Sequence, residues 1–169
     1  MESNRLTILM CPLNEYGHVN PCIGIAKVLQ KRGHRIVCAI PREWKGELIK
    51  YGFEEQLFTD KSNINKRPSE DIQKFMLNNG VLNNIPLLEK MRLSLLRLYT
   101  EVKSKHHYYN FQIKLIINRV KPDLIVVDSW FTIMPAFAKG SYRWITYHSA
   151  NPLSLFDNEQ MPPPYSGNK

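Results

Sequence analysis

Short apolar runs alternate along the chain with stretches in which apolar residues recur at helical spacing. Residues 6–10 (LTILM) form the first run, and residues 35–40 (RIVCAI) form the second, which stops before Pro41. A continuous apolar run is typical of a parallel strand buried on both faces. Between the runs the apolar positions have helical spacing: Val19, Cys22, Ile23, Ala26 and Leu29. Gly33 is placed to end that helix, so the pattern predicts a strand–helix–strand unit.

The alternation continues through the rest of the chain. The further predicted elements are a short helix over 42–51, a strand over 53–59, a helix starting at Ser69, a helical region over 86–120, a strand over 124–127, a helix over 134–139 and a strand over 144–147. Strands that alternate with helices favour a parallel sheet with right-handed crossovers. We therefore predict an α/β fold, a Rossmann-like open parallel sheet with helices on both faces, followed by an irregular tail over 153–169.

The helical region over 86–120 carries an apolar stripe. Its members are spaced alternately by three and four residues: Leu88, Met91, Leu95, Leu98 and Val102. Such a stripe faces something apolar. The sheet is one candidate for that neighbour, and a lipophilic substrate cleft is the other.

Composition and charge narrow the class of protein. The 169 residues are 43% hydrophobic and 22% charged, as in one globular domain. The net charge of +8 comes from scattered basic residues without an RNA-binding signature, so we expect no nucleic-acid partner. No apolar run approaches the roughly 18 residues that span a bilayer, and no secretory signal is visible. We expect a cytoplasmic protein whose three cysteines are reduced core residues.

Two residues at strand ends are candidates for chemistry. His18 follows the first predicted strand, and Asp128 follows the strand over 124–127. The carboxyl ends of parallel strands meet at one edge of a sheet, where open α/β sheets bind ligands. An imidazole can accept a hydroxyl proton while a carboxylate fixes its tautomer. Simpler roles stay open, because a histidine at a helix start is often a surface residue and an aspartate after a strand is often an N-cap.

Three segments, in order, carry a resemblance to a known family. They are residues 17–21 (GHVNP), 122–130 (PDLIVVDSW) and 147–152 (YHSANP). The chain resembles the N-terminal, acceptor-binding domain of the UDP-dependent glycosyltransferases, which are inverting enzymes with the two-domain GT-B fold. The likeness runs from about Arg5 to Pro152. It implies that residues 1–169 form a single acceptor-binding domain and that the C-terminal nucleotide-sugar domain is absent.

The resemblance also implies roles for individual residues. His18 aligns with the catalytic base that deprotonates the acceptor hydroxyl, and Asp128 aligns with its carboxylate partner. Ser149 stands where the family places a small hydroxyl residue near the transferred sugar. The residues that fall along the acceptor cleft are Tyr16, Gly17, Phe75, Leu88, Met91, Trp130, Phe131 and His148. The implied partners are a small lipophilic hydroxyl-bearing acceptor and, in the full-length enzyme, a UDP-sugar, with no metal and no cofactor.

Other functions stay open at this point. The leading hypothesis is part of a detoxifying UDP-glycosyltransferase, nearly inactive without its nucleotide domain. The alternative is a truncated, non-catalytic module that binds small molecules or another chain. A Rossmann-like nucleotide binder fits poorly, since no GxGxxG follows the first strand. His106 and His107 make a poor metal site, because adjacent helical residues point to different sides.

Overall fold

A computed structural model describes residues 5–58, 73–74, 76–78, 86–129, 137 and 142–149; for helical residues 94–95 and 97–107 it describes the backbone. The elements are, in order, β1 (Thr7–Cys11), α1 (Tyr16–Lys31), β2 (Arg35–Ile40), the 3-10 turns η1 (Arg42–Trp44) and η2 (Ile49–Tyr51), β3 (Glu54–Leu57), α3 (Leu87–Val120), β4 (Leu124–Asp128) and β5 (Trp144–Tyr147). Residues 73–74, 76–78 and 137 are also helical.

The five strands form one parallel sheet in the order β3-β2-β1-β4-β5. The central strand β1 pairs with β2 through Ile8 and Ile36 and with β4 through Ile8 and Leu124. The chain therefore winds outward from β1 in one direction and then returns to its other side. This is the doubly wound order of Rossmann-like folds, and it confirms the predicted fold class.

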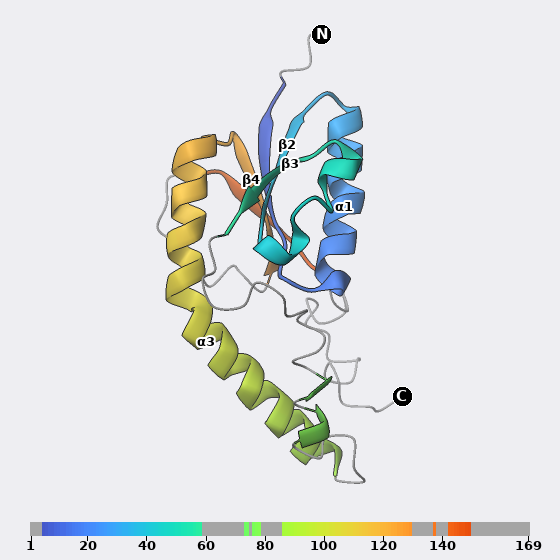
Figure 1. Ribbon diagram of the computed structural model, residues 1–169, viewed down its shortest axis with the longest axis vertical. Coiled ribbons are helices and arrows are strands. Elements are labelled where there is room, and N and C mark those ends of the chain that lie inside the picture. Colours follow the sequence, from blue (N-terminus) through green and yellow to red (C-terminus); the bar gives the residue numbers. More distant parts are fainter. Residues whose placement is uncertain are drawn as a thin grey trace, which may run out of the picture.

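Helices cover the two faces of the sheet, with α1 on one side and α3 on the other (Figure 1). Alternate residues of a strand point to opposite faces. Accordingly, Ile8 and Met10 pack in a cluster with the α1 residues Val19, Cys22 and Ala26. Leu9 and Cys11 pack in a second cluster with the α3 residues Ile113, Ile116 and Ile117. The apolar runs of the sequence are thus buried on both faces.

The connection from β1 to α1 determines where His18 lies. Helix α1 begins at Tyr16, so His18 is its third residue and lies in the first turn. The backbone N–H of His18 donates to the Glu15 carbonyl at 2.9 Å. At the other end Gly33 takes a φ of 91°, the left-handed conformation that lets the chain leave a helix.

The predicted helix over 42–51 is wrong, because two short 3-10 turns replace it. Gly46, with a φ of 86°, separates them. The carboxylate of Glu55 accepts hydrogen bonds from the backbone N–H groups of Gly46, Leu48 and Ile49 at 2.8, 2.8 and 3.2 Å. A side chain from the following strand thus satisfies donors that a continuous helix would satisfy internally.

Helix α3 contacts the sheet with its C-terminal turns. Ile113, Ile116 and Ile117 are buried there, whereas Leu88, near the N-terminus of the helix, is 82% exposed. The idea that the stripe from Leu88 onward packs on the sheet is therefore wrong at Leu88. The helix is 34 residues long, and its N-terminal half extends past the sheet (Figure 1).

The bounds of the predicted helices that start at Ser69 and span 134–139 lie outside the described residues, while the bounds of the predicted strands and of the helical region over 86–120 agree to within two residues. The strands over 35–40 and 144–147 have the predicted bounds, while the first strand is displaced by one residue and the third is shorter. The predicted tail over 153–169 lies outside the described residues. Among the residues that the model describes, no helix is long and apolar enough to cross a membrane.

Candidate active site

The candidate site lies where the winding of the sheet reverses. Strands β1 and β4 are neighbours, yet the chain leaves β1 through α1 and reaches β4 through α3, on opposite faces. In open α/β sheets the carboxyl ends of two such strands are the usual ligand position. His18 follows β1, and Asp128 is the last residue of β4.

The predicted contact between His18 and Asp128 is present. The Nδ1 atom of His18 lies 2.8 Å from Oδ2 of Asp128. The carboxylate side chain has no exposed surface, while the imidazole side chain is 18% exposed. The buried carboxylate of Asp128 therefore contacts the inner side of the His18 ring, while the imidazole itself stays accessible to solvent or a bound molecule.

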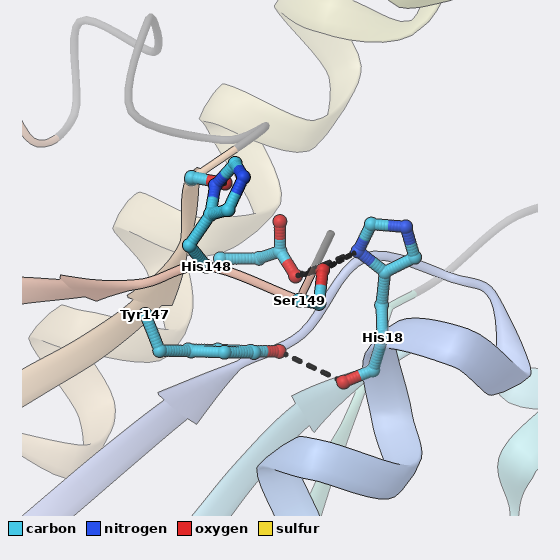
Figure 2. Close-up of polar contacts among 6 residues, drawn as sticks. His18, Tyr147, His148 and Ser149 are labelled. Atoms are coloured by element: carbon cyan, nitrogen blue, oxygen red, sulfur yellow. Dashed lines mark hydrogen bonds and ion pairs between the residues drawn. The ribbon is translucent and has the colours of Figure 1, made fainter. Parts of the chain in front are cut away.

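Ser149 joins this pair from the loop after β5. Its Oγ atom lies 2.5 Å from Nδ1 of His18 and donates to Oδ2 of Asp128 at 3.1 Å. Figure 2 shows the hydroxyl beside the imidazole, with the second ring nitrogen directed away from Ser149. Three polar side chains, far apart in the sequence, thus form one closed cluster.

The hydrogen bonds of the cluster select one tautomer of the imidazole. A carboxylate oxygen can only accept, and the Ser149 hydroxyl uses its single proton to donate to Asp128. Both oxygens near Nδ1 are consequently acceptors, so Nδ1 carries the proton. Nε2 is then the nitrogen with the lone pair, which is the arrangement that a general base requires.

Tyr147 holds the backbone of His18. Its hydroxyl donates to the His18 carbonyl at 3.0 Å (Figure 2). Burial, followed by the nearby Cys22 and Asp128, raises the pKa of the Tyr147 hydroxyl far above its ordinary value. The group therefore remains a neutral donor, and the last residue of β5 holds the main chain of His18.

Hydrogen bonds and a contact between aromatic rings hold the loop before α1 against η1. The indole N–H of Trp44 donates to Oδ1 of Asn14 at 2.6 Å, and the amide of Asn14 donates to Glu43 at 2.8 Å. The rings of Trp44 and Tyr16 meet edge to face, with centroids 4.8 Å apart. Tyr16, which is 50% exposed, is thereby held at the start of the helix that carries His18.

The predicted acceptor-binding residues are only partly described. Gly17 precedes His18 in α1, and a methyl group added to it would meet no atom within 4 Å. Leu88 and Met91 lie in the first turns of α3, where Leu88 is exposed and Met91 is partly buried. Phe75, Trp130 and Phe131 lie outside the described residues. The binding role of all these residues stays a prediction.

A second serine–histidine contact lies at the same edge of the sheet. His148, predicted to bind the acceptor, has its Nδ1 atom 2.8 Å from Oγ of Ser129, the residue after β4. Residues 128 and 147 pair directly in the sheet. The residues that follow them are consequently neighbours as well, and this explains why Ser129 and His148 meet.

Sequence reasoning missed four parts of this arrangement. It named Tyr147 and Ser149 in one motif but did not connect either of them with His18, and it did not single out Ser129 or Trp44. The available signal was that the strands over 124–127 and 144–147 follow one another along the chain. Consecutive strands are commonly neighbours in a sheet, and the residues after them then lie side by side. Among the described side chains, no group of three or more ligating residues could hold a metal ion.

Comparison with known proteins finds similarity at the level of structure but not at the level of sequence families. No family model and no curated protein sequence matches the chain. Solved structures do match. The spinosyn rhamnosyltransferase SpnG matches with a TM-score of 0.61 and 14% identity, covering 88% of this chain and 37% of that one. CalG4, the calicheamicin glycosyltransferase, matches with a TM-score of 0.59 and 18% identity over 86% of this chain and 33% of its own.

A plant protein extends the comparison. Arabidopsis thaliana UGT89C1 matches with a TM-score of 0.53 and 15% identity, over 85% of this chain and 34% of its own. This chain has the fold of one domain of a GT-B glycosyltransferase. It spans about a third of the length of the three structures. One SpnG structure holds spinosyn aglycone and another holds thymidine diphosphate.

Proposed function

We propose that this chain is the acceptor-binding domain of a UDP-glycosyltransferase that transfers a sugar to a hydroxyl of a small lipophilic acceptor, with inversion. The observation that carries the proposal is the Nδ1-to-Oδ2 contact of 2.8 Å between His18 and the buried Asp128. It favours the imidazole tautomer with its lone pair on Nε2, at the edge of the sheet where ligands bind.

The reaction follows from this protonation state. The acceptor hydroxyl gives its proton to Nε2 of His18, and its oxygen attacks the anomeric carbon. The bond from that carbon to the diphosphate oxygen breaks, and the electron pair leaves with UDP. One displacement from the opposite side inverts the anomeric carbon. The charge of Asp128 stabilises the imidazolium that forms, since it lies against the protonated Nδ1.

The nature of the two substrates is part of the proposal. Exposed apolar side chains, Tyr16 at the start of α1 and Leu88 on α3, suit a lipophilic acceptor. The nucleotide sugar is assigned to a second domain, because this chain matches only about a third of the length of each of these enzymes. We place the activity in the cytoplasm, in detoxification of foreign alcohols and phenols. The three buried, unpaired cysteines suit a reducing compartment.

The test compares histidine variants of the full-length protein, with UDP-glucose as donor and 2-naphthol as acceptor. His18→Ala is expected to lower kcat by about 10³-fold, because the proton acceptor is lost. His34→Ala is the matched control. Its Nδ1 accepts from the Leu6 backbone N–H at 3.3 Å, at the opposite end of the strands, so turnover should be unchanged.

The result is read by chromatography of the glucoside and of released UDP. Full turnover by His18→Ala would overturn the assignment of the base. Acceptor binding without any transfer by the wild-type protein would favour the alternative, a module that binds small molecules but does not react them.

A further inference from the structure

We infer that Ser149 is a positioning residue that holds the proton of His18 on Nδ1 and so keeps the lone pair on Nε2. The inference rests on the proposed function, and it extends that function by assigning Ser149 a role toward the base. It depends on one geometric feature, the closed triangle of hydrogen bonds that joins His18, Asp128 and Ser149.

The directions of the hydrogen bonds give Ser149 this role. Its Oγ atom donates to Oδ2 of Asp128 at 3.1 Å, so the same oxygen can only accept from Nδ1 of His18 at 2.5 Å. Moving the proton to Nε2 would leave the lone pair of Nδ1 facing the carboxylate oxygen, and the Ser149 hydroxyl could then donate to Nδ1 only by giving up its bond to Asp128. With the proton on Nδ1 the hydroxyl makes both bonds, so it adds to the tautomer preference set by Asp128.

The surroundings of Ser149 make the contact rigid. Tyr147, two residues earlier, is anchored to the His18 carbonyl at 3.0 Å, and its side chain is buried in the cluster beneath α1. The backbone of 147–149 is thereby fixed against the first turn of α1. Because the serine side chain is short, a fixed backbone holds its hydroxyl in one position. The side chain has few rotamers, so it loses little conformational entropy when it is held there.

The second serine at this edge does not duplicate the role. Ser129 Oγ contacts Nδ1 of His148 at 2.8 Å, whereas Ser149 contacts both members of the proposed catalytic pair. The Ser149 hydroxyl donates directly to the carboxylate of Asp128. Removal of the Ser149 hydroxyl should therefore affect His18 rather than His148.

The first measurement needs no activity. In the full chain labelled with ¹⁵N-histidine, two-bond ¹⁵N–¹H spectra report which ring nitrogen carries the proton. The wild-type protein at pH 8 should show a protonated Nδ1 and an unprotonated Nε2 for His18. Ser149→Ala should increase the population protonated at Nε2, and Ser149→Thr, which keeps the hydroxyl, should restore the wild-type spectrum. Thr146→Ala removes an exposed hydroxyl from the same strand and is the matched control.

The second measurement is kinetic, with UDP-glucose and 2-naphthol. Ser149→Ala should lower kcat about tenfold with little change in either KM, since the hydroxyl orients the base rather than a substrate.

A raised KM for UDP-glucose, with unchanged kcat and unchanged imidazole signals, would overturn the inference and make Ser149 a donor contact. A wild-type His18 protonated at Nε2 would overturn it without any variant. If the wild-type protein transfers no sugar, the proposed function fails while the spectra still decide the positioning role.

Discussion

One oxygen of Asp128, Oδ2, lies within hydrogen-bond distance of both His18 and Ser149. It belongs to a side chain with no exposed surface. A buried carboxylate with two donors is held in a single orientation, and its charge is poorly screened by solvent. Its effect on the imidazole is consequently both geometric and electrostatic.

Asp128→Asn separates these two effects. The amide keeps the shape but loses the negative charge, so the imidazolium that forms during transfer is less stabilised. We expect kcat to fall by about 10²-fold while KM for 2-naphthol changes little, as measured by steady-state kinetics.

Asp123→Asn is the control for Asp128→Asn. Asp123 accepts from the Thr7 backbone N–H at 2.7 Å at the other end of the strands, and an asparagine oxygen can keep that bond. A loss of turnover in Asp123→Asn as large as in Asp128→Asn would mean that both changes act through stability.

At the scale of single residues, the sequence was sufficient to predict some contacts of the candidate site but not others. The meeting of His18 and Asp128 follows from a rule of parallel sheets, because each residue comes just after or at the end of a strand. The contact of Ser149 with both depends on the direction of a side chain in an irregular loop. No periodicity specifies that direction. The hydrogen bond of Tyr147 to a helical carbonyl is likewise a matter of packing between β5 and α1.

At the element scale, the loop between β1 and α1 depends on a neighbouring turn for its shape. Trp44 closes that contact, since its indole N–H donates to Asn14 and its ring packs on Tyr16. The indole is buried, with 7% of its surface exposed. Trp44→Phe keeps an aromatic ring but leaves the Asn14 carbonyl oxygen without this donor.

We expect Trp44→Phe to lower the free energy of unfolding by about 1–2 kcal/mol, measured by urea denaturation. Trp144→Phe is the comparison variant, because Trp144 is 37% exposed on β5 and should cost less. Equal losses in the two variants would show that the bond to Asn14 contributes nothing measurable.

The success of element prediction differs between two adjacent segments. Residues 36–40 are a continuous apolar run before Pro41, and the strand over 35–40 has the predicted bounds. Residues 42–51 have the composition of a short helix. Three of their backbone N–H groups, those of Gly46, Leu48 and Ile49, instead donate to the Glu55 carboxylate of the following strand. A tertiary contact of this kind overrides local propensity, and the local sequence carries no sign of it.

At the scale of the whole molecule, the core contains acids that lose protons only when the chain unfolds. Cys11, Cys22 and Cys38 are buried and unpaired. Burial raises the pKa of the Cys22 thiol to about 12, and burial likewise raises the pKa of Cys11 and of Tyr147. The folded state therefore holds protons that the unfolded state releases near the ordinary pKa of each group.

The sign of the pH dependence follows. Below about pH 8 these groups are protonated in both states and have no effect. Above about pH 9 the unfolded chain binds fewer protons, so the free energy of unfolding falls by up to about 1.4 kcal/mol per pH unit for each such group. Urea denaturation between pH 7 and 11 should show this decline.

Cys22→Ala tests the source of the decline. Removing the thiol lowers stability at pH 7 through lost packing, but it should make the fall between pH 9 and 11 shallower than in the wild-type protein. A free energy of unfolding that stays constant over this range in the wild-type protein would contradict the prediction.

The architecture of the molecule was largely predictable, while the order of its strands was not. Alternating strand and helix patterns require parallel strands joined by crossovers, and this was enough for the fold class. The order β3-β2-β1-β4-β5 depends on which face each crossover covers. That choice is made by packing between α3 and residues such as Leu9 and Cys11, and apolar periodicity does not show it.

Among the strands that the structure describes, β5 has a neighbour on one side, β4, and its residues Trp144 and Ile145 are well exposed. The same short strand supplies Tyr147, which anchors the His18 backbone, and leads to Ser149, which touches the His18 ring. Fraying at this margin of the sheet would consequently release the imidazole before the centre of the fold is disturbed. Amide hydrogen exchange along 144–147 would then report how much of the time the proton acceptor is held in place.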